Sequence, residues 1–372
     1  MKIKLFSNII LLFFCFLSAY AAIDPYQVDP NPPPMISGYT LKWSDEFNEK
    51  GKPDNKNWIY ETGFIRNHEY QWYQSNNANC SDGLLQIVSK HEQVTNPYYN
   101  ASSSDWTLNR RYADYTSASI NTNGLHSWLY GRFIVRARIP AFNGSWPAIW
   151  TLGATGEWPS CGEIDIMEYY DNSILANAAW GTSTQWVAKW KTSKTFLSHF
   201  TTSDPDWANK FHVWRMDWTV DYIKLYIDDE LLNSIDLKIT INADGTNPFH
   251  SAQYLLLNLA IGGDSGGDPG QTSFPITYSV DYARVYQESA SSLDEIKGID
   301  FRPVLVGSKL YIPNENKESM DISVYELSGK LILNKILGQN VNTIDVSNVK
   351  KGVYTIRLSC LGRTKVFKFI MQ

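Results

Sequence analysis

Short runs of apolar residues, broken by Gly, Asn, Asp and Pro, recur from residue 39 onward. Their length and their β-branched and aromatic content are typical of strands, and no long stretch carries an apolar stripe with a helical period. The clearest of these runs are residues 84–89, 133–139, 213–218, 223–227, 254–259 and 278–286. Many short strands separated by turn signals predict an all-β fold, in the form of a β-sandwich.

One of the predicted strands carries acids on one face. Residues 161–170 read Cys-Gly-Glu-Ile-Asp-Ile-Met-Glu-Tyr-Tyr. Successive side chains of a strand point to opposite faces, so Glu163 and Asp165 share a face, whereas strict alternation would bury Glu168 without a partner. A one-residue bulge at Ile166 or Met167 would return Glu168 to the acidic face. We therefore predict three carboxylates in one row.

Such a row is suited to glycoside hydrolysis, which needs one carboxylate as nucleophile and a carboxylic acid that protonates the leaving oxygen. Like charges at this spacing keep at least one proton, so one pKa should rise toward the working pH, as a general acid requires. The alternative is a solvated strand with an acidic outer face. Lys, Thr or Ser would be expected between the acids of such a strand, because neighbouring like charges repel.

Residues 162–168 resemble the signature of glycoside hydrolase family 16 in its longer form. The resemblance continues in family order through residues 43–47, 115–118, 130–133, 146–150, 258–263 and 280–286. It covers about residues 39–287 and implies a concanavalin-like β-jelly-roll sandwich with a substrate cleft on its concave sheet. It also implies that Glu163 is the nucleophile, that Asp165 assists it, and that Glu168 is the acid/base.

Residues 67–73 mix amides, an acid and aromatic rings at strand spacing, as a site that binds sugar hydroxyls and stacks on sugar rings would. By resemblance this segment lines the cleft, so Asn67, Glu69 and Gln71 are predicted to bind substrate. Trp146 is the first candidate for stacking against a sugar. Trp150, four positions further, would share its face but is expected in the core.

Two positions depart from the family pattern and leave the sugar open. Ser119 follows Thr-Ser-Ala, where laminarinase-like members often carry Arg, and Trp180 stands about where many members place a His. Both positions line the cleft by resemblance, so Trp180 is a further candidate for substrate binding. Two polar loops are also expected: residues 90–114, either a cleft wall or decoration, and residues 171–209, an irregular segment that borders the cleft.

The resemblance implies a retaining endo-glycosidase that acts on β-1,3- or β-1,3/1,4-glucan and needs no redox or organic cofactor. One alternative is the same chemistry on a marine galactan, because agarases and carrageenases share the longer motif. Lys189, Lys191 and Lys194 could supply a basic cleft for a sulfated galactan. The other alternative is a non-catalytic glycan-binding protein, which would have no need of both Glu163 and Glu168.

A structural calcium ion is a further implication of the resemblance. Glu46, Asp281 and the carbonyl of Gly83 fall where some members bind such an ion on the convex side, and oxygen ligands of this kind suit calcium. Without the resemblance, isolated acids in strands predict no metal. Cys80 and Cys161 could form a disulfide in an oxidising compartment, although nothing in their spacing demands it.

The two ends of the chain indicate export. Residues 1–21 are predicted to be a secretory signal peptide, with two lysines, an apolar run too short for a membrane span, and Ala-Tyr-Ala before the cut. A Pro-rich lead-in or tether (22–38) follows. Residues 288–297 read as a linker, and residues 298–372 as a separate small β-domain without Trp. This last domain resembles the C-terminal sorting domain of the Bacteroidetes type IX secretion system; an accessory carbohydrate-binding module is the alternative.

Composition narrows the class of partner. The chain has 372 residues, of which 43% are hydrophobic and 19% charged, so it can bury a large core and form two or three domains. A net charge of -5 gives no reason to expect nucleic acid or an anionic membrane as partner. We expect a monomer, secreted or at the cell surface, that binds a polysaccharide and is recognised by the secretion machinery.

Overall fold

The computed structural model describes residues 23–289 and, towards the C-terminus, residues 303–306, 308–312, 320–326, 330–338, 343–360 and 363–371. The expected signal peptide (1–21) and most of the expected linker (288–297) lie outside the described residues. The chain divides into two compact units. The first comprises Thr40–Gln287 with residues up to Met35, and the second comprises Glu288–Gln372 with Ile36–Tyr39.

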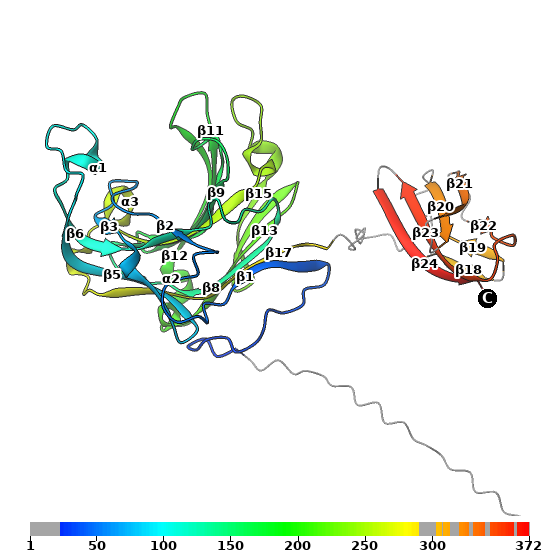
Figure 1. Cartoon of the computed structure of the whole chain (residues 1–372), viewed down its shortest axis with the longest axis horizontal. Helices are drawn as coiled ribbons and strands as arrows, with labels where there is room; N and C mark the ends of the chain where they lie inside the picture. Colours follow the sequence, from blue (N-terminus) through cyan, green and yellow to red (C-terminus); the bar gives the residue numbers. More distant parts are fainter. Residues whose placement is uncertain are drawn as a thin grey trace, which may run out of the picture. The chain divides into compact units, whose positions relative to one another are not determined.

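Two sheets form the layers of the first unit (Figure 1). The strands of the ten-stranded sheet are β1 (Tyr39–Asp45), β3 (Gln71–Tyr73), β4 (Ala78–Ser81), β5 (Leu84–Thr95), β6 (Tyr112–Ser117), β8 (Gly131–Arg138), β13 (His212–Trp218), β14 (Tyr222–Ile227), β15 (Glu230–Asp236) and β17 (Ile276–Glu288). The strands of the seven-stranded sheet are β2 (Ile59–Tyr60), β7 (Ser119–Asn121), β9 (Ser145–Gly153), β10 (Glu163–Tyr170), β11 (Ser173–Gly181), β12 (Ala188–Phe196) and β16 (Gln253–Ile261).

The order of strands brings segments distant in sequence together. The larger sheet runs β15-β14-β13-β8-β17-β5-β6-β3, with β1 on β17 and β4 on β5, and the smaller sheet runs β12-β11-β10-β9-β16-β7-β2. Helical turns connect the strands: α1 (Trp106–Asn109), α2 (Leu197–Thr201), α3 (Gly263–Gly266), η1 (Ser75–Asn77), η2 (Trp207–Asn209), η3 (Leu237–Ile239), η4 (Pro248–His250) and η5 (Pro269–Gln271). The six strands expected from apolar runs are all present, so the prediction of an all-β jelly roll is confirmed.

The core lies between the two sheets and is rich in aromatic side chains. Trp58, Trp214 and Trp218 are almost fully buried there, and β10 contributes Ile164 from the smaller sheet. Removing this much apolar and aromatic surface from water is the main term that stabilises a sandwich of this kind. The strand that carries the acids, β10, is therefore anchored through its opposite face.

The bulge expected in the acidic strand is present in β10. Its register against β9 shifts between Asp165 and Met167, and its register against β11 shifts between Asp165 and Glu168. Ile166 and Met167 are both fully buried in the core, one directly after the other. The extra residue returns Glu168 to the face that holds Glu163, because strict alternation would have buried it.

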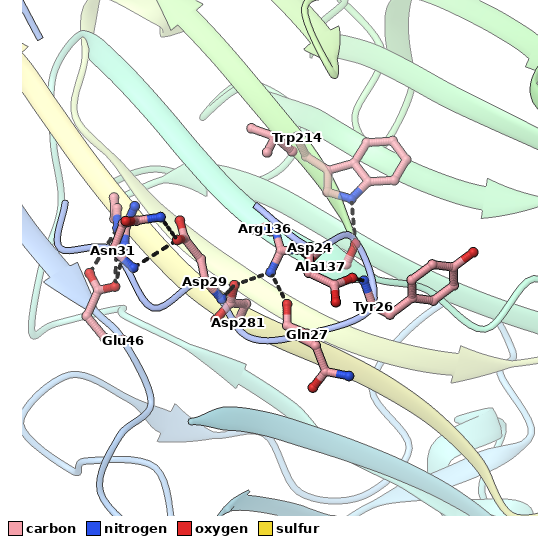
Figure 2. Close-up of polar contacts among 12 residues, drawn as sticks. Asp24, Tyr26, Gln27, Asp29, Asn31, Glu46, Arg136, Ala137, Trp214 and Asp281 are labelled. Carbon is pink, nitrogen blue, oxygen red and sulfur yellow. Dashed lines mark hydrogen bonds and ion pairs between the residues drawn. The ribbon is translucent and has the colours of Figure 1, made fainter. Parts of the chain in front are cut away.

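The lead-in is not a free tether, since its polar groups bond to the larger sheet (Figure 2). Arg136 on β8 donates to the carbonyl oxygens of Asp24 and Gln27 at 2.9 and 2.8 Å. The backbone N–H of Asp29 donates to Asp281 on β17 at 3.0 Å. Residues 23–35 are thus part of the fold of the first unit.

Two segments differ from their expected form, and the possible disulfide is not formed. Residues 171–209 are not irregular: they contain β11, β12, α2 and η2. Residues 67–73 are a strand only at their end, because Asn67 and His68 adopt positive φ angles of 54° and 48° in a tight turn before β3. Cys80 and Cys161 are both buried and both free, so they form no disulfide.

The second unit contains two small sheets, of strand orders β18-β19-β22 and β21-β20-β23-β24. The bounds are β18 (Val304–Val306), β19 (Lys309–Tyr311), β20 (Met320–Glu326), β21 (Leu331–Leu337), β22 (Thr343–Asp345), β23 (Gly352–Cys360) and β24 (Arg363–Met371). Ile322, Val324 and Ile356 are fully buried in its own apolar core. A small C-terminal β-domain was expected, and these strands form it. In the described parts of both units, no helix is long and apolar enough to cross a membrane.

Candidate active site

A cleft of about 600 Å³ lies over the face of the seven-stranded sheet that points away from the core. Glu163 and Glu168 both line it. Strand β10 enters the cleft through Gly162, whose φ is +81° and where an added Cβ would lie 2.8 Å from Pro248. Any other residue would be strained and crowded at this turn, so Gly162 fixes the direction in which the acidic row begins.

The three carboxylates lie on one face of β10, as predicted. Asp165 is only 1% exposed and pairs in register with Asn177 on β11. Asn177 Nδ2 donates to Asp165 Oδ2 and to Glu168 Oε2, both at 3.1 Å. One amide thus joins the middle and the last acid of the row.

Burial and mutual repulsion raise the pKa values of all three acids. Burial raises the pKa of Glu168 to about 7, and the charge of Glu163 adds to the effect. Burial also raises the pKa of Asp165 well above its usual range, with contributions from Glu168 and then Glu163. For Glu163, burial raises the pKa, whereas hydrogen bonds from Trp158 and Asp165 oppose the rise. At neutral pH the row therefore holds protons and negative charge together, as acid/base chemistry requires.

Two indole groups hold the outer acids of the row. Trp146 Nε1 donates to Glu168 Oε1 at 2.8 Å, and Trp158 Nε1 donates to Glu163 Oε2. Trp146 was expected to stack on a sugar, and it does line the cleft. The sequence reading missed Trp158 and Asn177. A signal for Asn177 existed, because it is the polar residue in the otherwise apolar run 174–180 that follows the acidic strand.

Aromatic side chains also form the walls of the cleft. Trp150 is buried, as expected, but in a small apolar cluster with Ala148 and Leu256 that is separate from the main core, and it lines the cleft together with Trp146. Its Nε1 donates to Asn258 at 2.7 Å. Trp186 and Trp190, at the tip and on the second strand of the β11–β12 hairpin, also line it and are 57% and 46% exposed. Exposed indole rings beside acids are well suited to stacking against sugar rings.

Of the other residues predicted to bind substrate, some line the cleft and others do not. Asn67 and Glu69 line the cleft, whereas Gln71 lies behind Glu69, to which its Nε2 donates at 2.6 Å. Trp180 does not reach the cleft: it is 5% exposed and packs in the main core. Alternation along β11 places Trp180 on the face opposite Asn177, so a role in substrate binding is wrong for this side chain.

Residues 90–114 support the cleft from outside and are not among its lining residues. Trp106 of α1 packs on Phe64 with ring centroids 5.8 Å apart and on His68 at 4.9 Å. Arg110 Nη1 donates to the carbonyl of Glu69 at 2.6 Å. These contacts hold the turn that carries Asn67 and Glu69.

The lysines considered for a basic cleft do not provide one. Lys189 and Lys191 are absent from the cleft lining, and Lys194 pairs with Asp171 at 2.7 Å. Of the side chains that line the described cleft, Arg66 is basic, while Glu69, Glu163 and Glu168 are acidic. The described lining of the cleft therefore carries more acidic than basic side chains.

The residues suggested for calcium do not fit the ion. Glu46 pairs with Arg284 at 2.6 Å and Asp281 with the buried Arg136 at 2.5 Å, as Figure 2 shows for the latter pair. A guanidinium already occupies each carboxylate where a calcium ion would bind. No group of three or more His, Cys, Asp or Glu within the described residues could hold a metal ion.

Comparison with known proteins agrees with this geometry. Residues 68–284 match the glycosyl hydrolases family 16, and residues 306–372 match the secretion system C-terminal sorting domain. The sorting domain indicates type IX secretion to the cell surface or the medium.

Curated relatives include a β-glucanase from Rhodothermus marinus, 33% identical over 67% of this chain and 85% of that protein. A glucan endo-1,3-β-glucosidase A1 from Niallia circulans is 33% identical over 68% of this chain, which spans 39% of that longer protein. A solved structure described for endo-acting O-glycanases of human gut microbiota that initiate mucin breakdown has a TM-score of 0.64 at 33% identity, covering 73% of this chain and 98% of that chain. With its acidic row, bulged strand and matched residues, the chain belongs to glycoside hydrolase family 16.

Proposed function

We propose that the protein is a secreted, retaining endo-glycosidase that hydrolyses internal β-1,3- or β-1,3/1,4-glucan linkages. The observation that carries the proposal is the row of Glu163, Asp165 and Glu168 on one face of bulged β10, inside a cleft with aromatic walls. The glucan-acting relatives support the choice of linkage.

The first half of the reaction forms a covalent intermediate. A carboxylate oxygen of Glu163 attacks the anomeric carbon and the bond from this carbon to the leaving oxygen breaks. Glu168 transfers its proton to that oxygen. A pKa of about 7 keeps a large fraction of Glu168 protonated at neutral pH, which this step needs.

The second half releases the sugar and restores both acids. Glu168, now ionised, takes a proton from water, and the water oxygen attacks the anomeric carbon and displaces Glu163. Asp165 keeps a proton because burial and the charges of Glu168 and Glu163 raise its pKa. From the middle of the row its single proton can be donated to either Glu163 or Glu168, so that it stabilises whichever of the two is charged.

A second candidate is the same chemistry on O-glycans of the mucin type. The O-glycanase structure favours it, with a TM-score of 0.64 and 98% of that chain covered. Marine galactans remain a third substrate class. The acidic lining of the cleft disfavours their sulfated forms, because a sulfate group would approach several carboxylates.

The test is product release by the mature full-length protein on laminarin, mixed-linkage β-glucan, agarose, carrageenan and mucin O-glycans, resolved by chromatography. Short oligosaccharides from a glucan support the proposal, whereas products from another polysaccharide alone keep the mechanism and replace the sugar. Glu163→Ala should abolish hydrolysis while leaving the fold and glycan binding nearly intact. Substantial turnover by this variant would overturn the assignment of the nucleophile, and binding without cleavage by the wild type would indicate a glycan-binding protein.

A further inference from the structure

Ser119 replaces an arginine that the family resemblance leads one to expect in the cleft, and the structure shows what its side chain does instead. Ser119 is fully buried and its hydroxyl donates to Glu61 Oε2 at 2.6 Å. The other oxygen of Glu61 accepts a hydrogen bond from Arg66 Nη2. Ser119 from β7, and Glu61 and Arg66 from the segment between β2 and β3, therefore form one connected group.

Arg66 brings a guanidinium to the cleft from the turn that precedes β3. Its side chain lines the cleft and is 21% exposed. The guanidinium carbon lies 5.0 Å from the ring centroid of Trp150, so the planar group is held against an indole that also lines the cleft. The ion pair with Glu61 and this ring contact restrict the orientation of the guanidinium.

One end of this guanidinium has no acceptor. Nη1 of Arg66 is buried and bonds to no group among the described residues. A charged donor without a partner is costly in a buried place, and ligand oxygens beside it would remove the cost. Arg66 and Glu163 line the same cleft, so a sugar bound beside Glu163 would lie next to this guanidinium.

We propose that Arg66 is a specificity-determining residue whose guanidinium, held by Glu61 and by the ring of Trp150, donates hydrogen bonds to hydroxyl groups of a sugar bound beside Glu163. This inference rests on the proposed glycosidase function. Arg66 acts on the sugar and, through its charge, on Glu163.

The charges around Arg66 indicate which sugars it can bind. Glu61 and Glu69 both act on Arg66 electrostatically, as does Tyr73, and their carboxylates compensate its charge. A uronate or sulfate group would meet these carboxylates as well as the guanidinium. Arg66 therefore recognises neutral hydroxyl groups, for which the fixed planar fork of arginine supplies directional donors.

The inference is tested by kinetics of Arg66→Gln and Arg66→Lys on the glycan that the wild type cleaves. Arg66→Gln should raise KM by about ten- to a hundredfold, the range for a lost hydrogen bond to a charged group, with a smaller fall in kcat. Burial raises the pKa of Glu163, and the charge of Arg66 opposes this rise. Arg66→Gln removes that charge, so the acid limb of its kcat/KM profile should lie at higher pH than in the wild type. Arg66→Lys should have the acid limb of the wild type but the raised KM of Arg66→Gln, because lysine keeps the charge and lacks the planar set of guanidinium donors.

The matched control is Arg111→Gln, an exposed arginine that packs on Tyr99 and Tyr112 and is absent from the cleft lining. It should leave KM and the acid limb unchanged. A lower melting temperature of Arg66→Gln with unchanged KM and acid limb would show that Arg66 is merely structural and would overturn the inference.

Failure of the proposed function is distinguishable from failure of the inference. If the wild type cleaves no glycan, the proposed function fails, and the same variants are compared by calorimetry with laminarihexaose, a mixed-linkage glucan oligosaccharide and poly-N-acetyllactosamine. Weaker binding by Arg66→Gln than by wild type and Arg111→Gln then supports the inference. Equal affinities, or no binding by any variant, overturn it.

Discussion

Trp146 Nε1 donates a hydrogen bond to Glu168 Oε1 over 2.8 Å, so an indole that lines the cleft also holds the proposed acid/base. Burial raises the pKa of Glu168 and the charge of Glu163 raises it further, whereas this hydrogen bond favours the ionised form and lowers it. The value of about 7 is the balance of these effects. If Trp146 stacks against a sugar and Glu168 is the acid/base, one side chain links substrate binding to proton transfer.

Trp146→Phe should move the alkaline limb of kcat/KM to higher pH. Phenylalanine keeps a ring but loses the donor, so the proton of Glu168 is held more tightly. The limb should lie near pH 7 in the wild type and several tenths of a pH unit higher in the variant. Trp150→Phe is the matched control, because its Nε1 donates to Asn258 instead. An unchanged limb in Trp146→Phe would contradict this role of the hydrogen bond.

Glu168→Gln should stabilise the fold above pH 7 and have little effect on stability at pH 4. The pKa of Glu168 is raised from 4.5 to about 7 in the folded state. Between these values the unfolded chain loses the proton while the folded chain keeps it, so stability falls as pH rises, by at most about 3 kcal/mol. Glutamine does not ionise and removes this loss.

Melting temperatures of wild type and Glu168→Gln across pH 4 to 8 check this expectation. Glu157→Gln, at an exposed position, controls for the loss of one carboxylate. Curves for Glu168→Gln and wild type that stay parallel across the range would count against a raised pKa.

Trp190→Ala should weaken binding of long substrates without affecting the fold. The ring is 46% exposed and lines the cleft, so it has little packing to lose and a stacking surface to offer. We expect a rise of about tenfold in KM on polysaccharide, corresponding to about 1.4 kcal/mol, with kcat and melting temperature nearly unchanged. Phe196→Ala, on the same strand but outside the cleft lining, is the control. Equal KM values for both variants would remove Trp190 from the binding surface.

Arg136→Gln should lower the stability of the first unit by about 3 to 5 kcal/mol, the usual cost of leaving one partner of a buried ion pair alone. The variant would leave the buried carboxylate of Asp281 without its ion-pair partner and would remove the donor to two backbone carbonyl groups of the lead-in. Asp281→Asn should have a similar effect, and calorimetry of both variants measures it.

Chelation should leave the melting temperature of the wild type unchanged, which calorimetry with and without EDTA checks. A fall of several degrees in EDTA would mean that a metal ion does contribute.

The strands and the bulge could be predicted because they leave a local signal. Alternation marks the strands, and Glu168 would break the alternation of β10 unless one residue bulged. The assignment of Trp180 to the cleft was wrong, and the position of Trp150 on the cleft side was not foreseen, for a different reason. Every residue of β11 is buried, and nearly all of β9 is, so neither strand shows which face meets the core and which meets the cleft. That choice depends on the sheet as a whole.

Contacts between distant segments were also beyond the sequence reading. Arg66 meets Trp150, and Glu61 meets Ser119, only once β2, β7, β16 and β9 are assembled in one sheet. The same holds for the arginines that bind Glu46 and Asp281, which removed the basis for a calcium site. Charge compensation of this kind is a property of the packed structure and has no short motif.

The bond between Asp29 and Asp281 joins residues separated by 252 positions. A chain made from its N-terminus onward cannot close this contact until β17 has left the ribosome, and contacts of such long range form slowly. The first unit should consequently stay incompletely folded during most of its synthesis. For a protein destined to pass through a membrane, late completion keeps the nascent polypeptide in a form that an export channel can still accept.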